Sequence, residues 1–266
     1  MYDLNHLAKH LQSASLKKKD ATFIHLHEND QLISFEDFFQ NAEKIASALI
    51  SAGIRPGDRV AMQVEKSSSA IELYFGTILA GAGFLPLNTA YVAEEIDFFL
   101  RDARPSIFVC DPSKLNNYTK IAESNGVSYI WTLSAEGTGS LIDAKNAESP
   151  GFTGVKRNPD DLAAVLYTSG TTGHSKGAML THRNLQSNAE ALVNCWQFTD
   201  EDFLIHALPL YHTHGLFVAT NVSLLAGSSM FLMKKFDADA ICRRMPQANV
   251  LMGVPKIGRA SCRERV

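Results

Sequence analysis

Tyr167 to Gly177 reads Y-T-S-G-T-T-G-H-S-K-G and overlaps the end of an apolar run, Leu162 to Tyr167, that predicts a buried strand. The segment combines three glycines, a run of Ser and Thr hydroxyls, and one lysine, Lys176. Glycines let backbone N–H groups approach a ligand, hydroxyls donate to phosphate oxygens, and lysine adds positive charge. Such a nest of donors favours an anion, so we predict a polyphosphate site. The alternative is a flexible Ser/Gly connection, because this composition is common in linkers.

The spacing of this segment differs from that of the P-loop NTPases. Their pattern, G-x-x-x-x-G-K-[ST], places the lysine directly after the second glycine. Here Lys176 follows Gly173 by three positions, and Gly177 comes next. We therefore exclude a simple P-loop NTPase.

Short apolar runs alternate with helical patterns along the chain, which predicts an α/β protein. Ser34 and Asp37 have the spacing of a capping box and predict a helix start, and Gly53 suits the left-handed residue that ends that helix. Ser134 to Asn158 shows little periodicity and is predicted to be a surface connection. We predict further strands at Val60–Val64, Phe84–Leu87, Ser106–Cys110, Phe203–Ala207, Met230–Leu232 and Val250–Val254, and helices at Ile71–Ala82, Ala93–Asp102, Asn184–Trp196, Leu216–Leu225 and Ala238–Met245.

The composition is that of an ordinary globular protein, with 266 residues, 45% of them hydrophobic, and a formal net charge of −3. This charge offers no basic field for nucleic acid or an anionic membrane. The four cysteines lack C-x-x-C spacing, so we expect free buried thiols and no metal site. No apolar run approaches the ~20 residues of a membrane span, and Met1–Lys19 lacks a secretory core. We expect a cytoplasmic protein, with the mitochondrial matrix as the alternative because this N-terminus is poor in acids.

The segment quoted above resembles the phosphate-binding loop of the adenylate-forming (AMP-binding) superfamily, whose pattern is roughly [YF]-T-S-G-[ST]-T-G-x-P-K-G. This chain departs from the pattern at Ser175, where proline is usual. Malonyl-CoA synthetases commonly read R-S-K-G there, so the departure favours that subfamily of acyl-CoA synthetases. The resemblance implies that ATP phosphates are bound by Thr168, Ser169, Gly170, Thr171, Thr172, Gly173, His174, Ser175, Lys176 and Gly177.

A second segment, Leu208 to Gly215 (L-P-L-Y-H-T-H-G), resembles the family motif that lines the acyl pocket. The resemblance implies that His212 lies near the carboxylate and the α-phosphate as a catalytic residue, with His214 in the pocket wall. The alternative is that both are ordinary loop histidines. A third stretch, Gly81 to Asn88, resembles an early core motif of the family, and we interpret it as a structural turn.

The resemblance extends from about Ser34 to Pro255 and implies the N-terminal part of the superfamily's large domain, a layered fold with a mainly parallel sheet. We expect residues 1–255 to be a partial AMP-binding domain. The Mg²⁺-binding glutamate, the ribose-binding aspartate, the arginine for malonate and the C-terminal domain with its lysine are expected beyond it. Lys256 leads into I-G-R-A-S-C-R-E-R-V, a string that one frame of a sequencing adapter encodes. We therefore expect 256–266 to be a non-native tail.

The resemblance also implies the chemistry of the parent enzyme. A small-molecule carboxylate, with malonate expected, attacks ATP to form an acyl-adenylate, and coenzyme A then takes the acyl group as a thioester. Two alternatives remain: an adenylation domain that loads a carrier-protein thiol, and a non-catalytic nucleotide-binding fragment.

Overall fold

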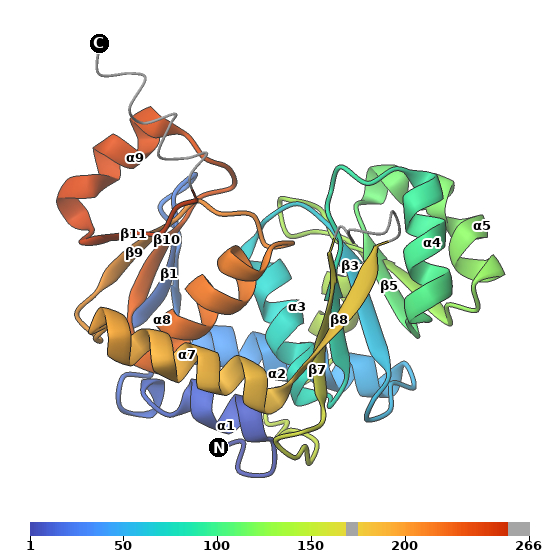
Figure 1. Cartoon of the computed structure of the whole chain (residues 1–266), viewed down its shortest axis with the longest axis horizontal. Coiled ribbons are helices and arrows are strands. Elements are labelled where there is room, and N and C mark those ends of the chain that lie inside the picture. Colours follow the sequence, from blue (N-terminus) through green and yellow to red (C-terminus); the bar gives the residue numbers. More distant parts are fainter. Residues whose placement is uncertain (169–174, 255–266) are drawn as a thin grey trace.

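The computed structural model describes residues 1–168 and 175–254 and arranges them around two sheets that stand side by side (Figure 1). Among these residues the larger sheet has the strand order β6-β5-β3-β4-β7-β8, and the smaller has the order β11-β9-β10-β1-β2. The strands are β1 Thr22–Leu26, β2 Leu32–Ser34, β3 Arg59–Gln63, β4 Gly83–Pro86, β5 Ile107–Cys110, β6 Tyr129–Thr132, β7 Leu162–Thr168, β8 Lys176–Thr181, β9 Phe203–His206, β10 Ser229–Leu232 and β11 Val250–Leu251.

Helices surround and separate the two sheets. The α-helices are α1 His6–Gln12, α2 Phe35–Ser51, α3 Ser68–Leu79, α4 Ala93–Ala103, α5 Leu115–Ser124, α6 Ser140–Asn146, α7 His182–Trp196, α8 Asn221–Ala226 and α9 Ala238–Arg244. A π-helical turn, His214–Thr220, leads into α8, and short 3₁₀ turns occur at Ser15–Lys17, Pro112–Lys114 and Met245–Gln247.

Both sheets are mainly parallel, which confirms the predicted fold class. Within the described strands, the exceptions are the antiparallel pairs β7–β8 and β1–β2. Parallel strands share one direction, so their carboxyl ends gather at one edge of each sheet. In α/β proteins, ligands bind in crevices outside those ends.

Helices α2 and α3 show how the sequence builds the core between the sheets (Figure 1). The predicted capping box starts α2: Ser34 Oγ accepts from the backbone N–H of Asp37 at 3.0 Å, and Gly53 takes a φ of 89° after the helix ends. Every residue of α3 after Ser68 is buried, as expected of a helix covered on all sides. A Cβ on Gly76 would lie 2.8 Å from Ile45 Cγ2, so a glycine is needed where α3 approaches α2.

Most predicted elements are present, with boundaries shifted by one to three residues, but four interpretations were wrong in part. The surface connection Ser134–Asn158 contains α6, which buries Leu141. The helix predicted over Leu216–Leu225 is divided between the π-helical turn and α8. The strand over Val250–Val254 is only Val250–Leu251, and Leu251 is exposed because little of the described chain covers this sheet edge. The thiols were expected to be buried; Cys110 is buried, but Cys195 and Cys242 are exposed.

Candidate functional site

The two flanks of the predicted phosphate segment are neighbours in one antiparallel pair. Thr168 ends β7 and lies opposite Lys176, which begins β8, and Tyr167 lies opposite Gly177. Lys176 and Gly177 are exposed, and Ser175 is half-buried. The other predicted phosphate ligands lie outside the described residues: Ser169, Gly170, Thr171, Thr172, Gly173 and His174.

The segment between β9 and the π-helical turn lies beside the end of β7. Tyr211 and His212 share a small pocket of about 40 Å³ with Leu166 and Tyr167 of β7, and its further lining comes from the end of β4 and the residues after it. The rings of Tyr211 and His212 lie 4.6 Å apart, and His212 is exposed. The structure therefore brings His212 next to the strand that leads into the predicted phosphate segment.

A larger cavity of about 510 Å³ is lined by the same segment. Val64, Leu87 and Thr89 follow β3 and β4 of the larger sheet, whereas Lys234 and Phe236 follow β10 of the smaller one. The segment Leu208–Gly215 completes the lining, including both His212 and His214. The carboxyl ends of both sheets thus face one cavity, at the position where α/β proteins bind ligands.

His214 is more enclosed than His212. Its side chain is half-buried, and burial lowers its pKa below the ordinary value of histidine, which favours the neutral ring at neutral pH. A Cβ on Gly215 would lie 2.0 Å from the carbonyl oxygen of Pro209. The segment therefore folds back closely on itself, and only glycine fits where it closes.

Lys66 and His206 lie behind this segment, and both are buried. Lys66 Nζ lies 2.7 Å from His206 Nδ1, 2.7 Å from the carbonyl oxygen of His206 and 2.8 Å from that of Leu208. Burial lowers the pKa of Lys66 well below its ordinary value, and burial together with the Lys66 charge does the same for His206. Sequence reasoning missed both residues, although Lys66 follows a predicted strand at the end where ligands bind.

The end of β7 is held against α4. The hydroxyl of Tyr167 donates to Asp102, and its ring lies 4.6 Å from that of Phe99. Burial and the neighbouring carboxylate raise the pKa of Tyr167, so it remains a neutral donor. These contacts position the strand end from which the predicted phosphate segment departs.

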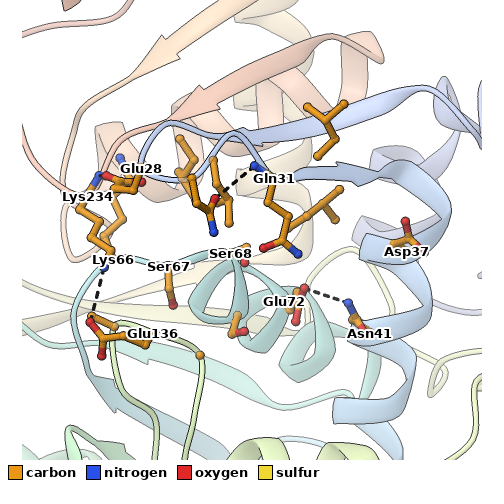
Figure 2. A pocket seen from close by; sticks show the side chains of 18 of the residues that line it. Glu28, Gln31, Asp37, Asn41, Lys66, Ser67, Ser68, Glu72, Glu136 and Lys234 are labelled. Carbon is orange, nitrogen blue, oxygen red and sulfur yellow. Dashed lines mark hydrogen bonds and ion pairs between the residues drawn. The ribbon is translucent and has the colours of Figure 1, made fainter. Parts of the chain in front are cut away.

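A second cavity of about 510 Å³ lies between the first turn of α3, the first two turns of α2 and the loop after β1 (Figure 2). Its lining is mainly polar, and the buried Glu72 accepts from Asn41 at 3.1 Å and from Lys145 at 3.4 Å. Burial raises the pKa of Glu72. Lys66 and Lys234 line both this cavity and the one beside His212, so they form part of the wall between them. No motif in the sequence marks the residues of this cavity as functional.

Metal and membrane features are limited in the described part of the chain. Residues 1–168 and 175–254 contain no group of three or more His, Cys, Asp or Glu side chains that could hold a metal ion. Among the described helices, none has the length and apolar character needed to cross a bilayer.

Comparison with known proteins identifies the family. The model described as "AMP-binding enzyme" matches residues 10–264. The chain belongs to the AMP-binding enzyme family. The resemblance seen in the sequence and the predicted fold are both confirmed. The structure is similar to ATP-bound MatB from Rhodopseudomonas palustris, with 48% identity and a TM-score of 0.93, over 97% of this chain and 50% of that one.

Relatives in this AMP-binding family include ligases for short dicarboxylic acids. A mitochondrial malonate–CoA ligase from Xenopus laevis is 27% identical over 235 residues, 84% of this chain and 40% of the relative. An oxalate–CoA ligase from Arabidopsis thaliana is 34% identical over 194 residues, 71% of this chain and 38% of the relative. The chain thus spans about half, or less, of the length of these relatives.

Proposed function

We propose that this chain is part of an ATP-dependent acid–CoA ligase that activates a small carboxylate, with malonate as the favoured acid. The observation that carries the proposal is the common site at the strand ends, where His212 lies beside Tyr167 and Thr168 lies opposite Lys176. The likeness to ATP-bound MatB and to ligases named for malonate and oxalate supports the same assignment.

The reaction has two displacement steps. In the first, a carboxylate oxygen attacks the α-phosphorus of ATP, the bond to the bridging oxygen breaks, and pyrophosphate leaves. In the second, the thiol of coenzyme A attacks the acyl carbon of the adenylate and AMP leaves. The thiol proton goes to solvent or to a base. Phosphoryl chemistry of this kind depends mainly on positioning and on electrostatic stabilisation of developing charge.

The chain's own residues are assigned to the first step. Lys176, together with the predicted donors Thr168 to Gly177, holds the leaving phosphates and neutralises their charge. His212 holds the acid near the α-phosphate, and His214 shapes the pocket in which the acyl group lies. Mg²⁺ would screen phosphate charge, and its ligand is expected outside these 266 residues. We also propose that this chain alone does not complete the reaction, because the lysine that serves adenylation is expected in the C-terminal domain of the parent enzyme.

The test uses the complete product of the gene that encodes this chain. Acid-dependent exchange of pyrophosphate into ATP is measured with malonate, oxalate, acetate and a medium-chain fatty acid, and kcat/KM is compared among them. We expect malonate to give the highest value, because a site built for a second carboxylate discriminates strongly against acids that leave it unpaired. Acetate or the fatty acid exceeding malonate would contradict the choice of acid. No exchange with any acid would contradict ligase activity altogether.

A further inference from the structure

The Lys66 side chain crosses from one sheet to the other behind the cavity that contains His212 and His214. Lys66 comes three residues after β3 of the larger sheet, and its Nζ contacts His206, the last residue of β9 in the smaller sheet. The residue is only 6% exposed, so water is largely excluded from these contacts. One buried amine therefore bridges the carboxyl ends of the two sheets that face the cavity.

The contacts of Lys66 hold one end of the cavity segment directly and the other end through His206. Lys66 Nζ donates to the carbonyl oxygen of Leu208 at 2.8 Å, where the segment begins. His206 Nε2 donates at 2.8 Å to the carbonyl oxygen of Gly215, where the segment closes. Because a carbonyl only accepts, the ring proton is on Nε2, and Nδ1 is free to accept from Lys66 at 2.7 Å.

We propose that Lys66 is a positioning residue of the acid site: through Leu208, His206 and Gly215 it sets the place of the segment that presents His212 and His214. This inference rests on the proposed function for the identity of the acid, but its geometric part stands on the contacts alone. Three acceptors surround Nζ, and lysine is the side chain that offers three donors at the end of a long arm. Neither arginine nor glutamine reproduces that arrangement in the same space.

Lys145 offers a matched control. It is also a poorly exposed lysine, with a side chain 12% exposed, and it pairs with Glu72 at 3.4 Å in the second cavity. Within the described residues, the hydrogen bond and ion pair of Lys145 are made with Glu72 and not with the segment Leu208–Gly215. Lys145→Met therefore removes a comparable charge and hydrogen bond without releasing the segment.

The first measurement uses the complete gene product and does not depend on activity. ¹⁵N spectra of the histidine rings report which nitrogen carries the proton. We expect His206 to carry it on Nε2 in the unchanged chain. In Lys66→Met, but not in Lys145→Met, the signals of His212 and His214 should move. If Lys66→Met does not fold, His206→Asn decides: its short amide keeps an acceptor near Lys66 but does not reach the carbonyl oxygen of Gly215, so the His214 signal should still move. Unmoved signals in the folded variants would overturn the inference.

The second measurement uses the complete gene product. A misplaced segment should reduce kcat/KM for malonate on the order of 10²-fold in Lys66→Met, with a raised KM for malonate and an unchanged KM for ATP. If Lys66 were only structural, its loss would lower the active fraction of the enzyme and hence kcat, but neither KM would change. We expect that second pattern for Lys145→Met. Equal kinetics in the two variants would overturn the inference. An unchanged protein that activates no acid contradicts the proposed function instead, and the histidine spectra then decide whether Lys66 positions the segment.

Discussion

Thr168 and Lys176 lie directly opposite each other where β7 and β8 pair. The predicted phosphate segment thus leaves and re-enters the fold at adjacent positions, and its lysine is placed at the edge of the sheet. Cross-strand pairing sets the separation of the two residues, so a hydroxyl and an ammonium are presented side by side at the carboxyl end of β7. The small pocket that Tyr167 shares with His212 lies at the same end of β7.

Gly215→Ala should disturb the segment that carries the two histidines. The added Cβ would meet the carbonyl oxygen of Pro209 at 2.0 Å, and a backbone atom cannot move away as a flexible side chain can. We expect a loss of about 1–3 kcal/mol in the free energy of unfolding, measured with denaturant.

Gly53→Ala is the control for that substitution. It lies in a turn at a φ of 89° with no heavy atom within 4 Å of the added Cβ, so its cost is backbone strain alone. Both variants should lose stability, but only Gly215→Ala should shift the ring signals of His212 and His214. Unchanged signals in Gly215→Ala would show that the contact with Pro209 does not hold the segment.

The stability of the chain should fall as pH decreases from about 6.5 to 4. Burial lowers the pKa of His182 to about 4, with Arg157 and His6 acting in the same direction and Asp161 opposing them. Below pH 6.5 the unfolded chain binds a proton that the folded chain does not, so unfolding is favoured. The lowered pKa of His182 corresponds to a loss of roughly 3 kcal/mol in the free energy of unfolding once both states are protonated. His206, whose pKa is also lowered, adds to the slope in the same direction.

His182→Asn should flatten that dependence, because asparagine keeps an acceptor near the backbone N–H of Leu7 but does not titrate. The free energy of unfolding is measured at several pH values between 7 and 4, in the range where the native state persists. An equal slope in His182→Asn and the unchanged chain would show that His182 is not the group responsible.

Tyr167→Phe should loosen the end of β7 from α4. The substitution removes the hydroxyl that donates to Asp102 and keeps the ring that packs on Phe99. With Asp102→Asn as the second change, a double-mutant cycle isolates the coupling between the two side chains, which we expect to be about 1 kcal/mol. A coupling indistinguishable from zero would remove this hydrogen bond from the account of how the site is positioned.

Local patterns predicted much of this fold because several elements depend on a few neighbouring residues. The Ser34–Asp37 capping box and the left-handed Gly53 were readable in sequence, since each is a contact or conformation within a few positions. Strand β8 was missed. It follows a segment rich in glycine and hydroxyls, and four of its six residues are exposed, so it lacks the apolar alternation that marks a half-buried strand.

From the sequence, only the parts of the candidate site that lie in a family motif could be predicted. His212 and His214 were identified through their motif, and the structure places both on one cavity. Lys66 was not identified, because its acceptors on His206 and Leu208 are 140 and 142 positions away in the chain. Burial of a lysine depends on such distant partners, and a single sequence does not show them. The assignment of the phosphate ligands stays a prediction, since Ser169 to His174 lie outside the described residues.

The central claim is that Lys176 and its neighbours hold the leaving phosphates of ATP, and comparing the two half-reactions of Lys176→Ala in the complete gene product tests it most directly. Loss of one charged donor should slow formation of the acyl-adenylate on the order of 10²-fold, roughly 3 kcal/mol. Thioester formation from preformed malonyl-adenylate should change little, because pyrophosphate has already left. Lys120→Ala, which removes an exposed lysine of α5, should alter neither rate. Equal losses in both half-reactions, or no loss in the first, would contradict the account.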